Sequence, residues 1–397
     1  MNEILRKYNQ EHLIKYYERC SDKDRFLKDI DRIDFEYMNS LYKAKNNEFV
    51  DEKISIVKPV IKSEIKDNAL DIMGAKIVDD GKLALITMAG GQGTRLGHDG
   101  PKGTYMLDLD KRTSLFEIIA SKISKYNIPW LIMTSNDNHE KTVEFFRDNN
   151  NFGIKTVKFF IQRELPLLHE DGKILVGPDG YISFGADGSG GIFNALLDND
   201  LITYLEKFNI SHIFINGIDN ILTNPVDFKM LGLAIEKKLG LLCKSVAKKS
   251  YDEKVGVFCY KNNKPSVIEY INIPEELSMA KDENDNYLYN DANINSYLLS
   301  IILLKEIINK KLPMYTAHKK ISYLNEENNI VVPISPNAYK FECFIFDAFK
   351  YANDFLVLRV NRTDEFAPIK NSDEAGVDCP SSAIKLYKDY IKNNFTK

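Results

Sequence analysis

The 397-residue sequence has few cysteines and no long apolar segment. The cysteines are five in number: Cys20, Cys243, Cys259, Cys343 and Cys379. This odd number and the lack of a CxxC pair argue against a disulfide scaffold, a zinc ribbon and a thioredoxin-like redox site. The longest apolar run, 298–304, is far shorter than the roughly 20 residues that span a bilayer. The N-terminal stretch lacks the apolar core of a secretory signal, so we expect a cytoplasmic protein with free thiols.

The sequence also lacks an excess of charge of either sign. Its 53 Lys and Arg residues nearly balance 57 Asp and Glu residues, which excludes a global field that attracts nucleic acid or an anionic membrane. Any phosphate-binding site must therefore be formed by a local group of positive charges. Hydrophobic residues at 44% and charged residues at 28% are ordinary for a globular protein and exclude global disorder. At roughly 150 residues per domain, the length predicts two or three domains and carries no signal for an oligomeric state.

Changes in residue pattern divide the chain into three expected parts. Residues 1–80 read mostly as helix and predict an N-terminal helical cap. Residues 81–332 alternate short apolar strands with helices, which is typical of a doubly wound, mostly parallel α/β sheet covered on both faces. Within this core, β-rich runs at 255–260 and 266–271 predict an inserted meander. Residues 333–397 are expected to form a small C-terminal α/β lobe.

The same patterns predict individual elements. The core strands are expected at 83–88, 130–133, 157–161 and 212–215, and the core helices at 114–126, 192–208 and 228–239. A further helix is expected over about 293–309, followed after Pro336 by a Phe-rich helix that contains Phe341, Phe344, Phe346 and Phe349. A strand at 355–360 and a helix from about Ser381 are expected to close the chain.

The most informative stretch is 83–106, in which an apolar strand leads into AGGQGTRLG and then PKG. Glycines let backbone N–H groups wrap an anion, and Arg95 and Lys102 can neutralise several negative charges, so we expect a polyphosphate ligand. A dinucleotide-binding loop would have glycine where Leu96 stands, and a Walker A loop would have Ser or Thr where Gly103 follows the lysine. The alternative is a tight glycine turn without a ligand.

Two polar residues follow predicted strands, where ligands collect in α/β sheets. The amide of Gln162 offers a donor and an acceptor side by side, as a pyrimidine edge requires, although a solvated side chain is the alternative. The carboxylate of Asp219 suits Mg²⁺, although an Asx turn or helix cap is the alternative. The sequence contains no HxxxH motif, no His–Cys cluster and no GxSxG elbow, and therefore no evident covalent nucleophile.

GGQGTRLG followed by PKG resembles the signature of the UTP-dependent sugar-1-phosphate uridylyltransferases, the UDP-N-acetylglucosamine and UDP-sugar pyrophosphorylase family. Over about 83–383, further segments match that family in order: FFIQRELP, DGSGGIFNAL, GIDNIL, EKVGV, VIEY, ANI, AHKKI, KFECFIFDAF and DEFAPIKN. The resemblance implies a GT-A-like (Rossmann-like) core that uses Mg²⁺, or Mn²⁺, to join UTP and a sugar 1-phosphate. N-acetylglucosamine 1-phosphate is the expected acceptor, ahead of glucose or galactose 1-phosphate.

The resemblance also assigns roles to individual residues. It implies Arg95, Lys102 and Lys370 as catalytic cations and Asp219 as the metal contact. It implies substrate-binding positions at Gly90, Gly91, Gly93, Thr94, Gln162, Gly188, Gly256, Glu269 and Asn293. The chain has Ser189 where the family usually has Asn, and Ala292 where it commonly has Gly. The alternative functions are a non-catalytic nucleotide-sugar binding protein of the same fold and an NAD-linked dehydrogenase.

Overall fold

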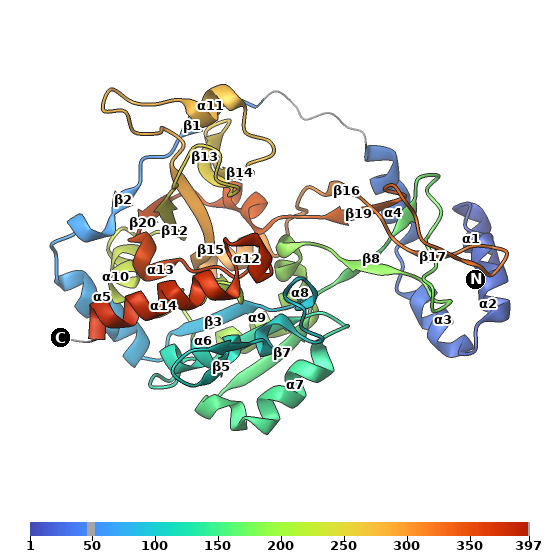
Figure 1. Cartoon of the computed structure of the whole chain (residues 1–397), viewed down its shortest axis with the longest axis horizontal. Coiled ribbons are helices and arrows are strands. Elements are labelled where there is room, and N and C mark those ends of the chain that lie inside the picture. The colour runs from blue at the N-terminus through green and yellow to red at the C-terminus, as the bar shows by residue number, and fades with distance from the viewer. Residues whose placement is uncertain (46–51, 396–397) are drawn as a thin grey trace. The chain divides into compact units, whose positions relative to one another are not determined.

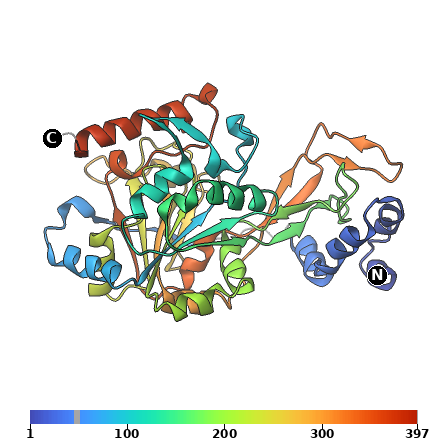
Figure 2. The same ribbon diagram turned by 90° about the horizontal axis from the view of Figure 1, so that it is seen from below.

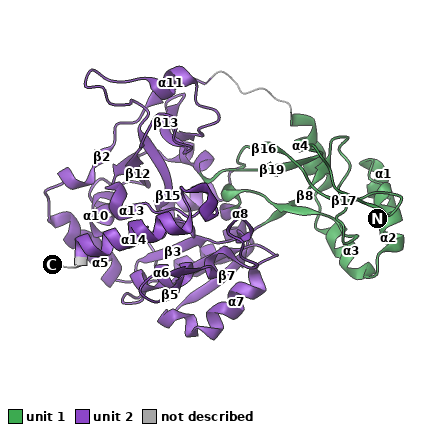
Figure 3. Ribbon diagram, viewed as in Figure 1, with its two compact units in different colours: residues 1–51, 163–191, 311–345 green, residues 52–162, 192–310, 346–397 purple. Residues whose placement is uncertain are grey.

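The computed structural model describes residues 1–45 and 52–395 (Figure 1). The chain forms two compact units, each assembled from three segments (Figure 3). The smaller unit comprises residues 1–51, 163–191 and 311–345, and the larger unit comprises residues 52–162, 192–310 and 346–397.

The expected boundaries at residues 80 and 332 coincide with no boundary between these units. Residue 80 lies inside the larger unit, because residues 54–79 contribute two strands and a helix to it, and residue 332 lies inside the smaller unit. Residues 46–51 of the expected cap and 396–397 of the expected C-terminal lobe lie outside the described residues.

A large sheet forms the centre of the larger unit. Its main path runs in the order β2 (Val60–Ile61), β20 (Phe355–Arg359), β12 (Leu241–Ala247), β15 (Asp291–Ser300), β11 (His212–Gly217), β3 (Leu83–Met88), β6 (Trp130–Thr134) and β7 (Val157–Ile161). Neighbours along this path are parallel, except that β15 is antiparallel to both β11 and β12. The expectation of an α/β fold with a mostly parallel sheet is therefore confirmed.

The expected meander is present as an antiparallel extension of this sheet. Its hairpin consists of β13 (Val257–Lys261) and β14 (Lys264–Ile268), which pair in antiparallel register. One edge of the hairpin pairs with β1 (Ile54–Ile56), and Val257 also pairs with β15. The hairpin therefore joins the central sheet.

Helices lie on both faces of the central sheet (Figure 2). The helices of the larger unit are α5 (Ala69–Asp79), α6 (Leu115–Ile123), α7 (His139–Asp148), α8 (Ile192–Asp198), α9 (Leu201–Lys207), α10 (Phe228–Glu236), α11 (Glu275–Met279), α12 (Ile301–Ile307), α13 (Arg362–Glu365) and α14 (Pro380–Phe395), of which α11 lies by the β13–β14 hairpin. Ser114 caps α6, because its hydroxyl accepts a hydrogen bond from the Glu117 amide at 3.0 Å. The helix expected over 192–208 is two helices, separated where Asp200 has a φ of 53°.

Two expected helices are wrong. Residues 291–300 form strand β15 and only 301–307 are helical, because this strand pairs on both sides and Ser300 then caps α12. This strand mixes apolar residues with buried Asp291, Asn293 and Ser296, so its periodicity alone did not distinguish it from a helix. The Phe-rich segment forms strand β19 (Ala338–Glu342) and a 3-10 helix (Ile345–Tyr351), and the unit boundary divides it after residue 345.

The smaller unit combines N-terminal helices with short antiparallel strands. The helices are α1 (Asn2–Lys7), α2 (His12–Arg19), α3 (Lys23–Asp31) and α4 (Phe35–Ala44), as the sequence predicted for this stretch. The strands are β8 (Glu164–Pro166), β9 (Leu168–His169), β10 (Phe184–Ala186), β16 (Tyr315–Lys319), β17 (Tyr323–Leu324), β18 (Ile330–Val331) and β19. Leu13, Phe26, Leu168 and Phe341 are buried in one apolar cluster of this unit. In the described part of the chain, no helix is long and apolar enough to cross a membrane.

Candidate active site

The glycine-rich loop runs from the end of β3 to β4 (Met106–Asp108) and is closed by its own backbone hydrogen bonds. The Gly93 amide donates to the Gly100 carbonyl at 2.9 Å, and the Lys102 amide donates to the Gly91 carbonyl at 3.0 Å. A Cβ at Gly91 would meet no atom within 4 Å, so this part of the loop is accessible to a ligand. The loop thus brings the expected cation Lys102 beside one of the expected phosphate-binding glycines.

Asn138 fixes the start of this loop, a role that the sequence reasoning missed. Its side-chain amide is fully buried and donates to the carbonyl of Ala89 at 2.9 Å and to that of Gly91 at 3.3 Å. Its side-chain oxygen accepts a hydrogen bond from the Ser135 amide at 2.9 Å. The available signal was a polar residue shortly after the apolar strand WLIMT.

Gln162 and Gly90 lie together at the carboxyl ends of their strands. A Cβ at Gly90 would lie 3.2 Å from the Gln162 side-chain oxygen. The backbone amide of Gln162 donates a hydrogen bond to the Thr134 carbonyl at 2.8 Å. Gln162 is only 7% exposed, which contradicts the alternative of a solvated side chain. The neighbouring Ser135 hydroxyl is buried and has no hydrogen-bond partner among the described residues, so it is a polar group that sequence reasoning did not single out.

The expected charged residues come together around Lys102. Burial lowers the pKa of Lys102, the carboxylate of Asp219 opposes this shift, and the charges of Lys370 and Arg95 add to it. Such interactions weaken with distance, so their joint effect on one ammonium group shows that residues far apart in sequence share one neighbourhood. Thr94 and Arg95 are exposed on the loop, where they are accessible to a ligand.

Asp219 and Lys370 belong to two chain segments joined by backbone hydrogen bonds. Asp219 follows β11 by two residues, and its carbonyl accepts a hydrogen bond from the Ile369 amide at 2.9 Å. The Lys370 amide donates to the Asp378 carbonyl at 2.6 Å. The lysine also lines a hollow of about 400 Å³ together with Lys249 and Lys254.

The three expected sugar-binding residues are also neighbours. The backbone amide of Asn293 donates a hydrogen bond to the Gly256 carbonyl at 2.8 Å. A Cβ at Gly256 would lie 2.9 Å from a Glu269 carboxylate oxygen. Burial raises the pKa of Glu269, and the positive charge of Lys370 opposes this shift. Asn293 lies on β15 rather than on the expected helix, and its side-chain oxygen accepts a hydrogen bond from the Tyr297 hydroxyl at 2.9 Å.

Gly188 belongs to the smaller unit. Its φ of +90° favours glycine, and a Cβ there would overlap the carbonyl oxygen of Cys343. The hydroxyl of the adjacent Ser189 accepts a hydrogen bond from the Ile345 amide at 3.1 Å. Packing within the smaller unit therefore accounts for this glycine, and its contact with a base stays a prediction.

A single carboxylate stands at the expected metal position. Among residues 1–45 and 52–395, no group of three or more His, Cys, Asp and Glu side chains is arranged to hold a metal ion. Mg²⁺ commonly takes one or two protein carboxylates and completes its shell with phosphate oxygens and water. Asp219, close to the cations expected to hold phosphates, fits that kind of site.

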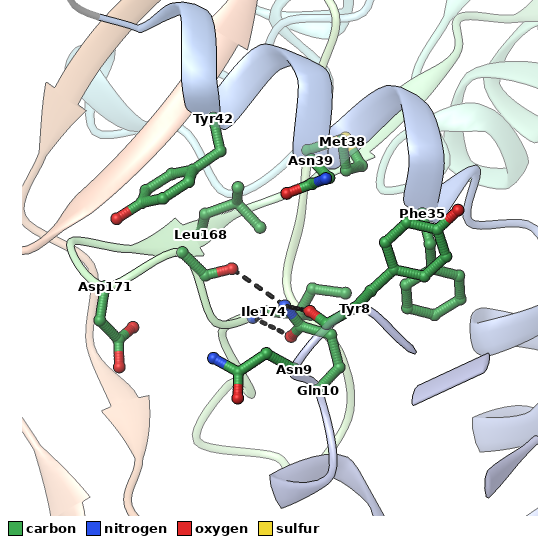
Figure 4. A pocket seen from close by; sticks show the side chains of 11 residues that line it. Tyr8, Asn9, Gln10, Phe35, Met38, Asn39, Tyr42, Leu168, Asp171 and Ile174 are labelled. Atoms are coloured by element: carbon green, nitrogen blue, oxygen red, sulfur yellow. Dashed lines mark hydrogen bonds between the residues drawn. The ribbon is translucent and has the colours of Figure 1, made fainter. Parts of the chain in front are cut away.

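Other hollows in the described part of the chain are separate from these residues. One, of about 520 Å³, lies where β3 and β11 begin and is lined by Lys82, His212 and Ser300 among others. Another, of about 120 Å³, lies in the smaller unit between the α1–α2 junction, α4 and the turn after β9 (Figure 4). There the Gln10 side chain donates to the Gly172 carbonyl at 3.0 Å and accepts from the Ile174 amide at 2.8 Å, which stabilises the turn.

Comparison with known proteins places the chain in a family. Residues 33–391 match the family model described as UTP–glucose-1-phosphate uridylyltransferase. A UDP-N-acetylglucosamine pyrophosphorylase of Saccharomyces cerevisiae is 34% identical over 97% of this chain and 85% of its own. The crystal structure of the pyrophosphorylase of that name from Trypanosoma brucei has a TM-score of 0.83 and 28% identity, covering 96% of this chain and 82% of its own.

The solved structure of a UDP-glucose phosphorylase is less similar to this chain. A UDP-glucose phosphorylase from Trypanosoma brucei has a TM-score of 0.63 and 18% identity, covering 90% of this chain and 76% of its own, and shows the fold alone. The family model covers most of the chain, and the yeast relative is similar over nearly all of it. The chain therefore belongs to the UTP–glucose-1-phosphate uridylyltransferase family.

Proposed function

We propose that the protein makes a UDP-sugar and pyrophosphate from UTP and a sugar 1-phosphate, with N-acetylglucosamine 1-phosphate as the preferred acceptor. The observation that carries this proposal is the electrostatic neighbourhood of Lys102, in which Arg95, Asp219 and Lys370 act on one ammonium group beside the glycine loop. A cluster of cations with one carboxylate suits a triphosphate and a divalent metal ion. Family membership supports the same reaction class.

The reaction needs positioning and charge neutralisation more than proton transfer. A phosphate oxygen of the sugar 1-phosphate attacks the α-phosphorus of UTP in line, and the bond to the leaving pyrophosphate breaks. The attacking phosphate is already ionised at neutral pH, so no general base is required. Arg95 and Lys102 hold the triphosphate and the leaving pyrophosphate, and Lys370 holds the two phosphates that become joined.

The remaining residues bind the nucleotide and the metal ion. The glycine loop, with Gly90, Gly91, Gly93 and Thr94, binds the phosphates, although the Gly93 amide is already bonded to the Gly100 carbonyl. Gln162 recognises uracil. Asp219 holds Mg²⁺, for which Mn²⁺ can substitute, and the ion supplies further charge neutralisation when bound. We assign the central sheet of the larger unit and its helices to a GT-A-like core. We also propose a cytoplasmic location, because the chain has only five cysteines, an odd number, and no CxxC pair, as is usual in a reducing compartment.

The acceptor assignment rests on the neighbouring residues Gly256, Glu269 and Asn293. A carboxylate and an amide suit the hydroxyl donors of a sugar. Ala292, where the family commonly has Gly, is fully buried and pairs with Val246 of β12 and with the β13 strand. The greater likeness to a structure named for N-acetylglucosamine than to one named for glucose supports this acceptor.

A pyrophosphate-release assay on the purified protein tests the proposal. With UTP and Mg²⁺, we expect the highest kcat/KM for N-acetylglucosamine 1-phosphate among the N-acetylglucosamine, glucose and galactose 1-phosphates. Lys370→Ala should lose most of this activity, whereas substitution of the exposed Lys392 by Ala in α14 serves as the control for loss of a lysine. Preference for glucose or galactose 1-phosphate would overturn the acceptor assignment, and UTP binding without turnover would favour a binding protein.

A further inference from the structure

We propose that Asn220 is a positioning residue whose side chain holds the Lys370 segment in register with Asp219. This inference rests on the proposed function, because it assumes that Lys370 and Asp219 act on the joining phosphates. Asn220 directly follows Asp219, the expected metal contact, in the sequence. The structure places it at the junction of the two segments that carry these charges.

The side chain of Asn220 pairs with the opposite segment as a neighbouring strand would. Its amide nitrogen donates to the Glu365 carbonyl at 2.8 Å, and its amide oxygen accepts from the Ala367 amide at 2.9 Å. Asn220 is 4% exposed, so water does not readily replace either partner. Loss of the side chain would leave a buried donor and a buried acceptor without partners, which is costly.

Backbone hydrogen bonds flank this clamp on both sides. The Ile221 amide donates to the Ala367 carbonyl at 3.2 Å, and the Ile369 amide donates to the Asp219 carbonyl at 2.9 Å. A slip of one residue along an extended segment moves a side chain by about 3.3 Å and reverses the face to which it points. The register that Asn220 and these backbone bonds hold together therefore sets where Lys370 lies relative to Asp219.

Two lysines anchor these segments to the core, and the side chains of Asn220 and Glu365 both link the segments. The Lys244 ammonium contacts both carboxylate oxygens of Glu365 at 2.8 Å, in a fully buried position. Lys122 donates to the carbonyls of Ile221 and Thr223, each at 2.7 Å. Each segment is thus held to the core, and the amide of Asn220 bridges the segments between these anchors.

A double-mutant cycle with Lys370 tests this role. We expect Asn220→Ala to lower kcat about 100-fold, because a displacement of about 1 Å in a reacting complex has an effect of that order. We expect a smaller change in the KM for UTP, since the glycine loop is untouched. In a Lys370→Ala background the same substitution should cost only a few-fold, because the residue to be positioned is absent.

Asn337→Ala is the matched control. The Asn337 side chain also makes two backbone hydrogen bonds, to the amide and carbonyl of Ile321, but it does so in the smaller unit. Whatever its effect on kcat, that effect should be equal with and without Lys370. Equal losses from Asn220→Ala in the two backgrounds would overturn the proposal.

Amide hydrogen exchange provides a readout that does not depend on activity. We expect the amides of Ala367 and Ile369 to exchange faster in Asn220→Ala than in the unmodified protein, and unchanged exchange would overturn the clamp. Asn220→Asp, which keeps only the acceptor, serves if the alanine variant does not fold. If the unmodified protein released no pyrophosphate, the proposed function would fail, while exchange would still decide whether Asn220 holds the segment.

Discussion

Among single residues, Lys102 has a pKa that its surroundings in the site lower. A lysine neutralises phosphate only while it is protonated. Burial and the charges of Lys370 and Arg95 lower its pKa, so in the ligand-free protein it loses its proton at a lower pH than an ordinary lysine. Its affinity for UTP should therefore fall as the pH rises through that lowered pKa.

Lys102→Arg should separate this titration from the other effects of alkaline pH. Arginine stays charged throughout the accessible range, so the variant should retain its relative kcat/KM for UTP to higher pH than the unmodified protein, even if its absolute value is lower. Lys102→Ala should lower kcat/KM about 1000-fold without unfolding the protein. Initial rates between pH 7 and pH 10 provide the measurement. Superimposable pH profiles for the lysine and arginine proteins would contradict the assignment.

At the scale of elements, two glycines bring α5 and α10 into close contact. A Cβ at Gly74 would overlap the carbonyl oxygen of Phe228, and a Cβ at Gly232 would overlap the carbonyl oxygen of Leu70. Glycine normally weakens a helix, so its presence in both helices is explained by this backbone-to-backbone packing. The close contact seats the helix pair in the core of the larger unit, where Leu70 and Leu231 are buried.

Gly232→Ala should destabilise the protein although alanine favours helices. The gain in helix propensity is about 1 kcal/mol, whereas forcing extra volume into a packed contact costs about 1–3 kcal/mol and here displaces backbone. We expect a lower midpoint of urea denaturation. Ile72→Ala in the same helix pair is the control, because Ile72 is largely exposed and should change stability by no more than about 0.5 kcal/mol. A midpoint raised by Gly232→Ala would refute the packing argument.

At the scale of the whole molecule, a buried group of charges couples stability to pH. Lys244, Lys62, Asp227 and Glu365 form ion pairs in the larger unit, and Lys122 lies close to them. Burial lowers the pKa of Lys122 to about 7. In the unfolded chain a lysine titrates near 10.4, so between about pH 7 and pH 10 the unfolded state binds more protons than the folded state. Stability should therefore rise with pH across this window through Lys122.

Lys122→Met should remove that contribution. The slope of unfolding free energy against pH should fall by up to about 1.4 kcal/mol per pH unit between pH 7 and pH 10. The free energy of unfolding should also be lower at each pH, because the carbonyls of Ile221 and Thr223 lose their hydrogen-bond donor. Urea denaturation at pH 7, 8, 9 and 10 measures both quantities. Parallel curves for the variant and the unmodified protein would rule out a neutral Lys122.

The sequence by itself determined the features that depend on neighbouring residues. The apolar run before AGGQGTRLG predicted β3, the periodic segment 114–126 predicted α6, and alternation of strands and helices predicted a mostly parallel sheet. Each of these signals is local, since it arises from periodicity, capping or turn chemistry within one segment. The ordered motifs also identified the family and the charged residues that the structure gathers around Lys102.

Only the tertiary structure decided the features that depend on distant partners. Residues 291–300 became a strand because β11 and β12 pair on either side of it, although the apolar content of this segment also suits a helix. The segment that ends in Lys370 lies along Asp219 because Asn220 and the backbone join residues about 145 positions apart. The smaller unit likewise recruits residues 163–191 and 311–345. Pairing across such distances is set by burial and hydrogen bonding in the folded chain, which no local pattern records.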